Sequence, residues 1–411
     1  MLTSTLISIL SLALAASAGP IVVRDNLIRI PLTKKINLTE PAQLVKQDQA
    51  RASFLRSLGG LAAGSLERER AVHSVAVQNQ ATSYVADVEI GTPPTSYSLL
   101  IDTGSSNTWV GAGKAYKHTS STQKTHNKVS VTYGSGSFSG DEYHDTVTLG
   151  RGLTIKQQSI GVATKAEGFD SIDGILGIGP ADLTVGTLSP DSHATIPTVT
   201  DKLFHEGIIP HNEVAISFEP TTSAENKNGE MTFGGVDHTK FTGEITYAPI
   251  TSTSPASDFW GIDQSIRYGA STNILSETAG IVDTGTTLTL IATDAFQRYQ
   301  RATGGVMDSA TGLLKITPAQ FANLKSLFFK INGVDFEFTA NAQIWPRALN
   351  SEIGGTADGI YLIVSDNGSQ SGEGLDFING MSFLERFYSV YDTSNSRVGI
   401  AYTPHTYDLT N

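Results

Sequence analysis

Two copies of one short phrase each place a carboxylate at the end of an apolar run. Residues 99–105 read Leu-Leu-Ile-Asp-Thr-Gly-Ser, and residues 280–286 read Gly-Ile-Val-Asp-Thr-Gly-Thr. The two aspartates, Asp102 and Asp283, are 181 positions apart. A carboxylate at the end of a buried strand is costly unless it is hydrogen-bonded, and the neighbouring hydroxyl groups and glycine turn can provide those bonds. Two such carboxylates that meet could share a proton and activate water for hydrolysis.

The flanking residues indicate an imperfect internal duplication that positions both aspartates. Residues 83–91 alternate as a strand, turn at 92–94 and return to Asp102. Residues 259–268 alternate in the same way, turn at 269–273 and return to Asp283. The 40 glycines and the 17% of charged residues are typical of a β-rich chain with many turns. Short helices are expected at 197–206, 293–302 and 317–327.

A glycine-rich hairpin is predicted at residues 129–140, which read Val-Ser-Val-Thr-Tyr-Gly-Ser-Gly-Ser-Phe-Ser-Gly. A tip of this kind can move and close over a substrate, which excludes water. A phosphate-binding loop is a competing interpretation, but the glycine spacing fits neither common phosphate motif and no helix clearly follows. A plain surface hairpin is the other alternative.

Taken together, these motifs resemble those of the pepsin-type aspartic endopeptidases. Residues 169–179 and 377–384 resemble the segments that pass behind the two catalytic loops in that family, and residues 229–237 resemble its inter-lobe strand. The resemblance runs from about Tyr84 to Ala401. Because the chain has no cysteine, it looks most like the basidiomycete polyporopepsin type.

The resemblance implies an all-β, bilobal fold with a central cleft, in which Asp102 and Asp283 act on a water molecule without metal or cofactor. It also implies supporting roles for residues around the pair. Thr103 and Thr284 would brace the two turns, and Ser105 would bind an outer carboxylate oxygen. Trp109 would hydrogen-bond the hydroxyl of a tyrosine that covers the scissile bond. The residues expected to contact substrate are Gly104, Tyr133, Gly134, Ser135, Gly285 and Thr286.

One segment departs from the family pattern. Behind the second catalytic loop the common sequence has Leu before a glycine and Asp after it, whereas this chain has Asn379 and Met381. The change removes an acid and adds an amide near the active site. We therefore expect an effect on the pH profile and not on the reaction.

The first 70 residues differ in character from the rest. Residues 6–16 are apolar and Ala16-Ser17-Ala18 fits a cleavage pattern, so 1–18 is expected to be a signal peptide. Residues 19–70 are expected to form a pro-segment, 71–243 the N-terminal lobe and 244–411 the C-terminal lobe. Residues 1–70 carry a net charge of +4 and the remainder −16, which favours an electrostatic clamp over a merely solvated basic tail.

The pro-segment is expected to inhibit its own enzyme. Residues 27–36 resemble the first strand of pepsinogen-type pro-segments, and residues 67–70 offer a charged processing site. Pro-segments of this family usually place a Lys across the two aspartates. No such Lys is identifiable, because residues 53–64 offer only Arg56, and the covering residue stays open at this stage.

Composition excludes several other classes of function. The nine histidines form no zinc motif, and the acidic body argues against nucleic acid. No other segment resembles a membrane span, so a secreted monomer acting on peptides is expected, with a vacuolar location as the alternative. Asn37 and Asn367 fit the glycosylation pattern. The rival functions are an inactive binding protein of the same fold and a retaining glycosidase, where two carboxylates also lie close together.

Overall fold

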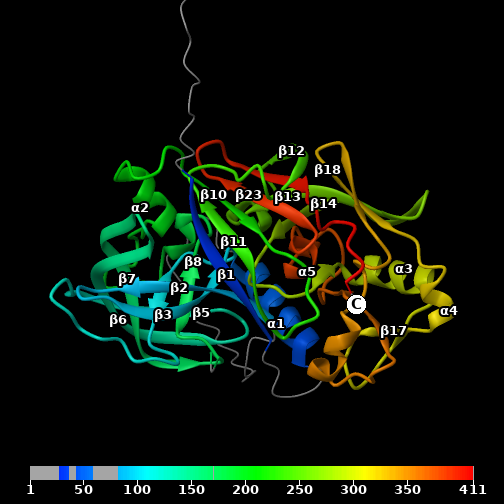
Figure 1. Cartoon of the computed structure of the whole chain (residues 1–411), viewed down its shortest axis with the longest axis horizontal. Coiled ribbons are helices and arrows are strands. Elements are labelled where there is room, and N and C mark those ends of the chain that lie inside the picture. The colour runs from blue at the N-terminus through cyan, green and yellow to red at the C-terminus, as the bar shows by residue number, and fades with distance from the viewer. Residues whose placement is uncertain (1–26, 37–42, 59–81, 170, 411) are drawn as a thin grey trace, which may run out of the picture.

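The computed structural model describes residues 27–36, 43–58, 82–169 and 171–410. Strands dominate and helices are few and short, so the predicted all-β class is confirmed. Figure 1 shows two β-rich halves with helix α1 (Gln43–Leu58) between them. Among the described residues, no helix is long and apolar enough to span a membrane.

A single large sheet runs through both halves. It has 14 strands, which in spatial order are β12 (Thr242–Pro249), β24 (Arg397–Tyr402), β23 (Phe387–Asp392), β10 (Glu213–Ser217), β11 (Glu225–Phe233), β1 (Ile28–Ile36), β2 (Thr82–Ile90), β3 (Thr95–Asp102), β8 (Gly174–Gly177), β4 (Thr108–Val110), β7 (Leu153–Glu167), β6 (Ser137–Gly150), β5 (Gln123–Thr132) and β9 (Leu188–Ser189).

Two smaller sheets and several helices complete the second half. The seven-stranded sheet has the order β19 (Val334–Phe338), β18 (Leu327–Ile331), β13 (Gly261–Tyr268), β14 (Thr272–Val282), β22 (Phe377–Asn379), β15 (Thr289–Ile291) and β21 (Val364–Asp366). The three-stranded sheet joins β16 (Val306–Met307), β17 (Leu314–Ile316) and β20 (Ile360–Leu362). The remaining helices are α2 (Val199–His205), α3 (Thr293–Thr303), α4 (Pro318–Phe321) and α5 (Met381–Leu384), with 3-10 turns η1 (Ala181–Thr184), η2 (Ala256–Asp258) and η3 (Arg347–Ile353).

The two predicted hairpins are present. β2 and β3 pair antiparallel, and so do β13 and β14. In β3 the residues that approach the first aspartate are all buried, so the strand delivers its carboxylate into the interior. β8 and β22 then pair in parallel beside β3 and β14, which places equivalent segments behind both aspartates.

The helix predictions are partly confirmed. α2 begins where Thr198 and Asp201 form a reciprocal cap, and α3 ends at Gly304, whose φ of 70° suits a glycine. The helix expected at 317–327 is wrong in extent, because α4 ends at Phe321 and Leu327 already begins β18. The apolar residues of that segment therefore serve two elements, which a single helical period cannot reveal.

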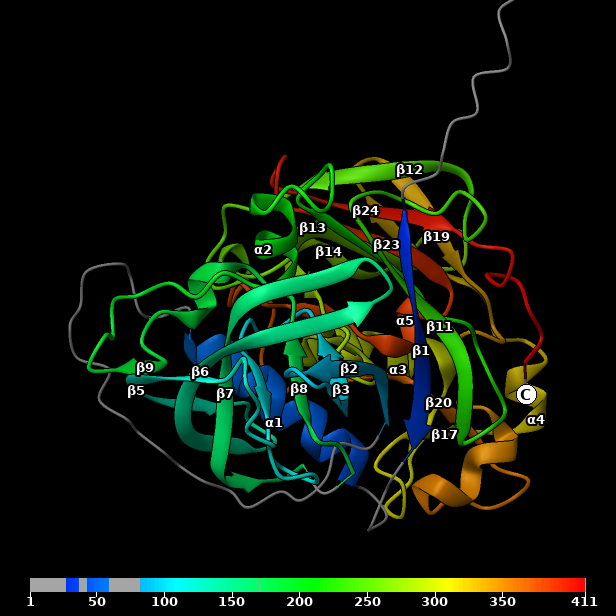
Figure 2. The ribbon, with the colours of Figure 1, turned by 60° about the vertical axis from the view of Figure 1, so that its left-hand side comes forward.

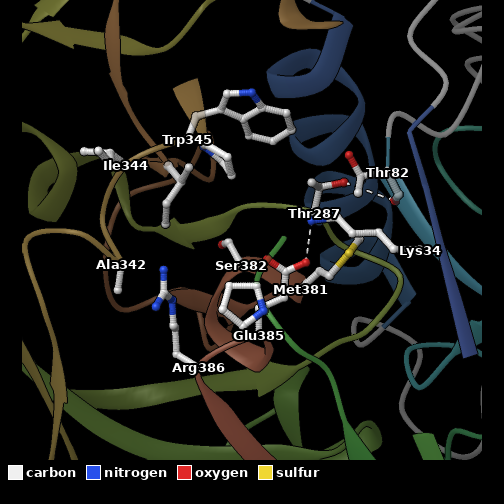
Figure 3. A pocket seen from close by; sticks show the side chains of 13 residues that line it. Lys34, Thr82, Thr287, Ala342, Ile344, Trp345, Met381, Ser382, Glu385 and Arg386 are labelled. Carbon is white, nitrogen blue, oxygen red and sulfur yellow. Dashed lines mark hydrogen bonds and ion pairs between the residues drawn. The ribbon is translucent and has the colours of Figure 1, made fainter. Parts of the chain in front are cut away.

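Strand β1 lies inside the large sheet, between β11 and β2 (Figure 2). This is the strand predicted at 27–36. Its side chains also reach the body of the protein, since Arg29 forms an ion pair with Asp237 and Lys34 forms a buried one with Glu385. Figure 3 shows Lys34 and Glu385 beside a small cavity of about 30 Å³. Segment 27–36 is thus an integral strand of the fold.

Candidate active site

The two Asp-Thr-Gly turns meet at the junction of the halves, where their threonines exchange hydrogen bonds. The amide of Thr103 donates to the hydroxyl of Thr284 at 3.0 Å, and the amide of Thr284 donates to the hydroxyl of Thr103 at the same distance. Each hydroxyl in turn donates to a backbone carbonyl of the opposite strand, at Val282 and Ile101. This reciprocal arrangement fixes the two turns against each other with pseudo-twofold symmetry.

Each carboxylate is supported by the residues that follow it. Asp102 accepts the amide of Gly104 at 3.0 Å and the hydroxyl of Ser105 at 2.5 Å. Asp283 accepts the amide of Gly285 at 3.0 Å and the hydroxyl of Thr286 at 2.6 Å. Both aspartate side chains are fully buried. The sequence repeat therefore corresponds to a repeat in hydrogen bonding. This is expected because a buried carboxylate needs protein donors in place of water.

Glycine is required at positions 104 and 285 because each approaches the opposite aspartate. A Cβ on Gly104 would lie 2.6 Å from Asp283 Oδ1, and a Cβ on Gly285 would lie 2.5 Å from Asp102 Oδ1. No real Cβ tolerates such contacts. The two glycines therefore allow the carboxylates to come close enough to share one bound group.

That shared group is the guanidinium of Arg51, from helix α1. Its Nη2 donates to Asp102 Oδ1 at 2.6 Å and to Asp283 Oδ1 at 2.9 Å, while its Nε donates to Asp283 Oδ2 at 2.7 Å. The side chain is buried together with both acids. A planar guanidinium suits this geometry because its donors form a rigid fork.

The sequence alone does not identify Arg51. The family resemblance predicts a Lys, and residues 53–64 contain Arg56 as their single cation. Helix α1 begins earlier, and its buried face includes Leu44, Asp48 and Leu55, which lie at helical spacing from Arg51. The helical period of the apolar residues Leu44, Ala52 and Leu55, which share this buried face, is the signal that could identify the position.

The pKa values of the two aspartates move in opposite directions. Burial raises the pKa of Asp102, and the charge of Asp283 adds to that effect while Arg51 opposes it. For Asp283 burial also acts upward, but the charge and hydrogen bonds of Arg51 outweigh it and lower the pKa below its ordinary value. The guanidinium of Arg51 therefore distinguishes two chemically identical groups in this form of the protein.

A second acid from α1 binds the loop after Asp283. The carboxylate of Asp48 accepts the amides of Thr287 at 3.2 Å and Leu288 at 2.7 Å. Burial raises the pKa of Asp48 to about 7, although these two hydrogen bonds and the charge of Arg51 oppose the rise. Helix α1 thus contacts the site through one acid and one base a single turn apart.

The predicted glycine-rich hairpin is formed by β5 and β6, and its tip carries Tyr133, Gly134 and Ser135. The tip lies against α1, since a Cβ on Gly134 would be 2.6 Å from the carbonyl oxygen of Ala50. Tyr133 and Ser135 are buried beneath it. We call residues 129–140 the flap.

The hydrogen bond expected between Trp109 and Tyr133 does not have normal geometry in this form. The two rings are 6.4 Å apart between centroids, and neither the indole N–H nor the phenol oxygen makes a hydrogen bond of normal geometry within the described residues. The flap rests on α1 in this form, so its position is set by the helix. The bond stays a prediction for a site without α1.

Asn379 and Met381 lie behind the second aspartate. The backbone oxygen of Asn379 accepts the amide of Asp283 at 3.1 Å, and its side chain exchanges two hydrogen bonds with Gln264. Met381 is buried and its amide donates to Thr286. The departure from the family pattern therefore puts a neutral amide pair where Leu is common, and a buried Met where an acid is common.

The side chain of Asn367, a possible glycosylation site, is not accessible in this form. It is fully buried, donates to the carbonyl of Leu375 and accepts from Ser369. Asn37 lies outside the described residues. Among those residues, no cluster of three His, Cys, Asp or Glu could hold a metal ion.

Comparison with known proteins agrees with this geometry. The family model described as "Eukaryotic aspartyl protease" matches residues 83–403. The chain belongs to the pepsin-like aspartic protease family. Polyporopepsin of Irpex lacteus is 67% identical over 336 residues, covering 82% of this chain and 98% of polyporopepsin. Gastricsin of Suncus murinus is 32% identical over 339 residues, covering 78% of this chain and 81% of gastricsin.

A solved structure extends the likeness to three dimensions. The crystal structure of aspartic proteinase from Irpex lacteus superposes with a TM-score of 0.81 at 59% identity, and the match covers 94% of this chain and all of that one. The predicted pepsin-like fold and the resemblance to the cysteine-free fungal type are confirmed. The protein is an aspartic-type endopeptidase, a hydrolase of peptide bonds.

Proposed function

We propose that this chain is the precursor of a secreted aspartic endopeptidase that works at acid pH with Asp102 and Asp283 as its catalytic pair. The observation that carries the proposal is the reciprocal support of the two carboxylates, which one guanidinium can bridge. Two acids held at that separation can bind one water molecule between them and hold a single proton.

The proposed reaction needs no covalent intermediate. One aspartate is ionised and accepts a proton from the water as its oxygen attacks the carbonyl carbon of the peptide. The other is protonated and donates to the carbonyl oxygen. A proton then passes to the amide nitrogen, the C–N bond breaks, and a carboxylic acid and an amine leave. Two carboxyl groups that lie this close together do not readily ionise at the same time, which fits this division of roles.

The residues around the pair would hold the substrate. Gly104, Gly285 and Thr286 present backbone and hydroxyl groups beside the carboxylates, and the flap would close through Tyr133, Gly134 and Ser135. Because Ser135 carries no charge, the pocket beside it favours a large apolar side chain before the scissile bond. Closure of the flap would also exclude bulk water.

The precursor would be inactive because α1 occupies the cleft. With Arg51 bonded to both aspartates, neither acid can hold the attacking water or receive a peptide. We assign residues 19–70 to this pro-segment, with processing near Arg70. The match to the eukaryotic aspartyl protease family model begins at residue 83, which fits this assignment.

The remaining assignments follow the sequence. Residues 1–18 would direct secretion, 71–243 would form the first lobe and 244–411 the second. The mature enzyme would act as a monomer on proteins and peptides. Relatives that are named probable vacuolar protease A make delivery to a vacuole the alternative location.

The test is removal of one acid at a time. Asp102→Asn and Asp283→Asn should each reduce peptide hydrolysis by on the order of a thousandfold, because each removes half of the proton-sharing pair. Asp358→Asn, at an exposed position, is the matched control and should retain full activity. Circular dichroism would establish that the variants are folded. An Asp102→Asn enzyme with most of its activity would refute the proposal.

A further inference from the structure

Besides its contacts with the aspartates, α1 binds a loop on the second half of the molecule. Gln49 Nε2 donates to the carbonyl oxygen of Asp366 at 3.0 Å, and Arg56 Nη2 donates to the carbonyl oxygen of Asn367 at 3.1 Å. Gln49 and Arg56 are seven residues apart, which is two helical turns, so both lie on one face of α1. That face meets the loop directly after β21.

This part of the loop presents acceptors to helix α1. The two carbonyl oxygens point to α1, and the charges of Glu373, Asp366 and Asp376 act on the Arg56 guanidinium. Burial lowers the pKa of Arg56 and the three carboxylates oppose that effect. Two oxygen acceptors inside a negative field select a cationic donor over a neutral or anionic group.

The three carboxylates differ in how they are held. Asp376 is buried and accepts the Thr278 hydroxyl and the amides of residues 372 and 373. Asp366 accepts the Thr293 hydroxyl and the amide of residue 368. Glu373 is exposed. The first two acids therefore shape the loop, and Glu373 is free to move toward an incoming charge.

Arg56 does not use the whole site. Its Nη1 is buried without a hydrogen-bond partner among the described residues. The rigid helix holds this guanidinium where one of its donors is not satisfied, which costs free energy. A cation on a flexible substrate could approach the same acceptors without that constraint.

We propose that this acceptor surface, formed by the carbonyls of Asp366 and Asn367 with Glu373, is a substrate subsite for a Lys or Arg side chain. The inference rests on the proposed function, in which α1 leaves the cleft and a peptide takes its place. Arg56 follows Arg51 by five residues, about 7.5 Å along a helix axis. An extended peptide covers that length in about two residues, so the basic side chain lies two or three residues from the scissile bond.

The test uses the acid-activated full-length protein and peptides in which Lys is compared with norleucine, its uncharged analogue. The two residues are placed in turn at the second and third positions on each side of one fixed scissile bond. At about pH 5, above the pKa of an unperturbed carboxyl group, one position should show kcat/KM about fivefold higher for Lys. That ratio is the size expected for a partly exposed ion pair.

Variants then assign the effect to the loop. Glu373→Gln should lower the Lys-to-norleucine ratio at that position to about twofold or less. Glu244→Gln, an exposed acid on β12, is the matched control and should leave the ratio at about five. Asp366→Asn should also lower the Lys-to-norleucine ratio at that position. If Lys is favoured at none of the four positions, or if neither loop variant lowers the ratio, the subsite does not exist.

The outcomes separate this inference from the proposed function. Cleavage of the norleucine peptides without any advantage for Lys would overturn the subsite and leave the endopeptidase intact. Failure to cleave any peptide after acid treatment would overturn both.

Discussion

Thr103 and Thr284 each donate a backbone amide to the other's side-chain hydroxyl, at 3.0 Å in both directions. Because both residues are buried, these bonds are protected from water and join the two halves at the point where the carboxylates meet. Each turn is therefore held in position by the other. Damage to one should therefore affect the position of both aspartates.

Replacing one of these hydroxyls tests that dependence. Thr103→Val keeps the volume but removes a donor and an acceptor, which leaves the amide of Thr284 buried and unpaired. We expect the free energy of unfolding to fall by about 1–3 kcal/mol, measured by denaturant titration of the precursor. Thr103→Ser restores the hydroxyl and should lose much less. Equal losses in the two variants would show that packing, and not the hydrogen bonds, joins the turns.

Removing the guanidinium should release the precursor's inhibition. Arg51→Met leaves two buried carboxylates without their cation, a change that typically costs 3–5 kcal/mol and here weakens the docking of α1. At pH 6, where the unchanged precursor is expected to be stable, the variant should lose its first 70 or so residues at least a hundredfold faster in intact mass spectra. Arg51→Lys keeps the charge and should lie between the two. An Arg51→Met precursor as inert as the parent would contradict the assigned role.

The docking of the pro-segment should weaken as the pH falls below about 4. Burial alone would raise the pKa of Asp237, but the hydrogen bond from Arg29 and those from Thr239 hold it well below its ordinary value. Arg51 lowers the pKa of Asp283 in the same way. Groups with depressed pKa values stabilise the docked state above their ordinary pKa and lose that contribution as the pH falls. Amide hydrogen exchange in β1 and α1 should therefore rise on acidification.

Asp48 should act in the opposite direction. Burial raises its pKa from an ordinary 3.8 to about 7, so its contribution to docking is complete below pH 3.8 and is lost as the pH rises through 7. Exchange in α1 should thus increase as the pH rises from about 4 to 7 and level off above that range, so docking should be tightest near pH 4. Asp48→Asn, which cannot ionise, should abolish the rise between pH 4 and 7 and keep the rise below pH 4. An unchanged rise between pH 4 and 7 in that variant would assign it to another group.

The flap residue Ser135 should restrict the position directly before the scissile bond to apolar side chains. A Lys buried there would lack a partner, whereas Leu, Phe or Met would gain roughly 1.5–3 kcal/mol by full burial. Peptides varied at that position should be cut at least tenfold faster after Phe than after Lys. Ser135→Asp should raise cleavage after Lys selectively. Comparable rates for Lys and Phe in the unchanged enzyme would mean that another acid serves this pocket.

The sequence predicts features that depend on neighbouring residues or on a motif that occurs twice. The hairpins before Asp102 and Asp283 follow from alternation, turn residues and a motif present twice, and the flap follows from its glycine-rich tip. The strand at 27–36 follows from the resemblance to pepsinogen-type pro-segments. The reciprocal threonine bonds are the structural form of that repeat. Residues close together in the chain determine the hairpins, the flap and the strand, whereas the threonine bonds join two copies of the motif 181 positions apart.

The features that were missed depend on contacts between distant residues. Arg51 meets Asp283 across 232 positions, and Lys34 meets Glu385 across 351. Asn367 carries a glycosylation pattern, yet the fold buries its side chain. In the segment from Pro318 to Ile331, one apolar run divides between a short helix and a strand. None of these outcomes is determined by nearby residues, because each depends on which surface the fold brings opposite.

The position of β1 has a consequence for the stability of the enzyme after the pro-segment is removed. Among the described strands it alone joins β11 to β2 within the large sheet, and without it the order separates into a group of five strands and a group of eight. A chain from which this segment has been cut no longer contains the strand that pairs with both groups. Maturation would then convert a molecule that can refold after unfolding into one that cannot refold once it has unfolded. The working lifetime of the enzyme would be set by how slowly it opens, and not by how well it could refold.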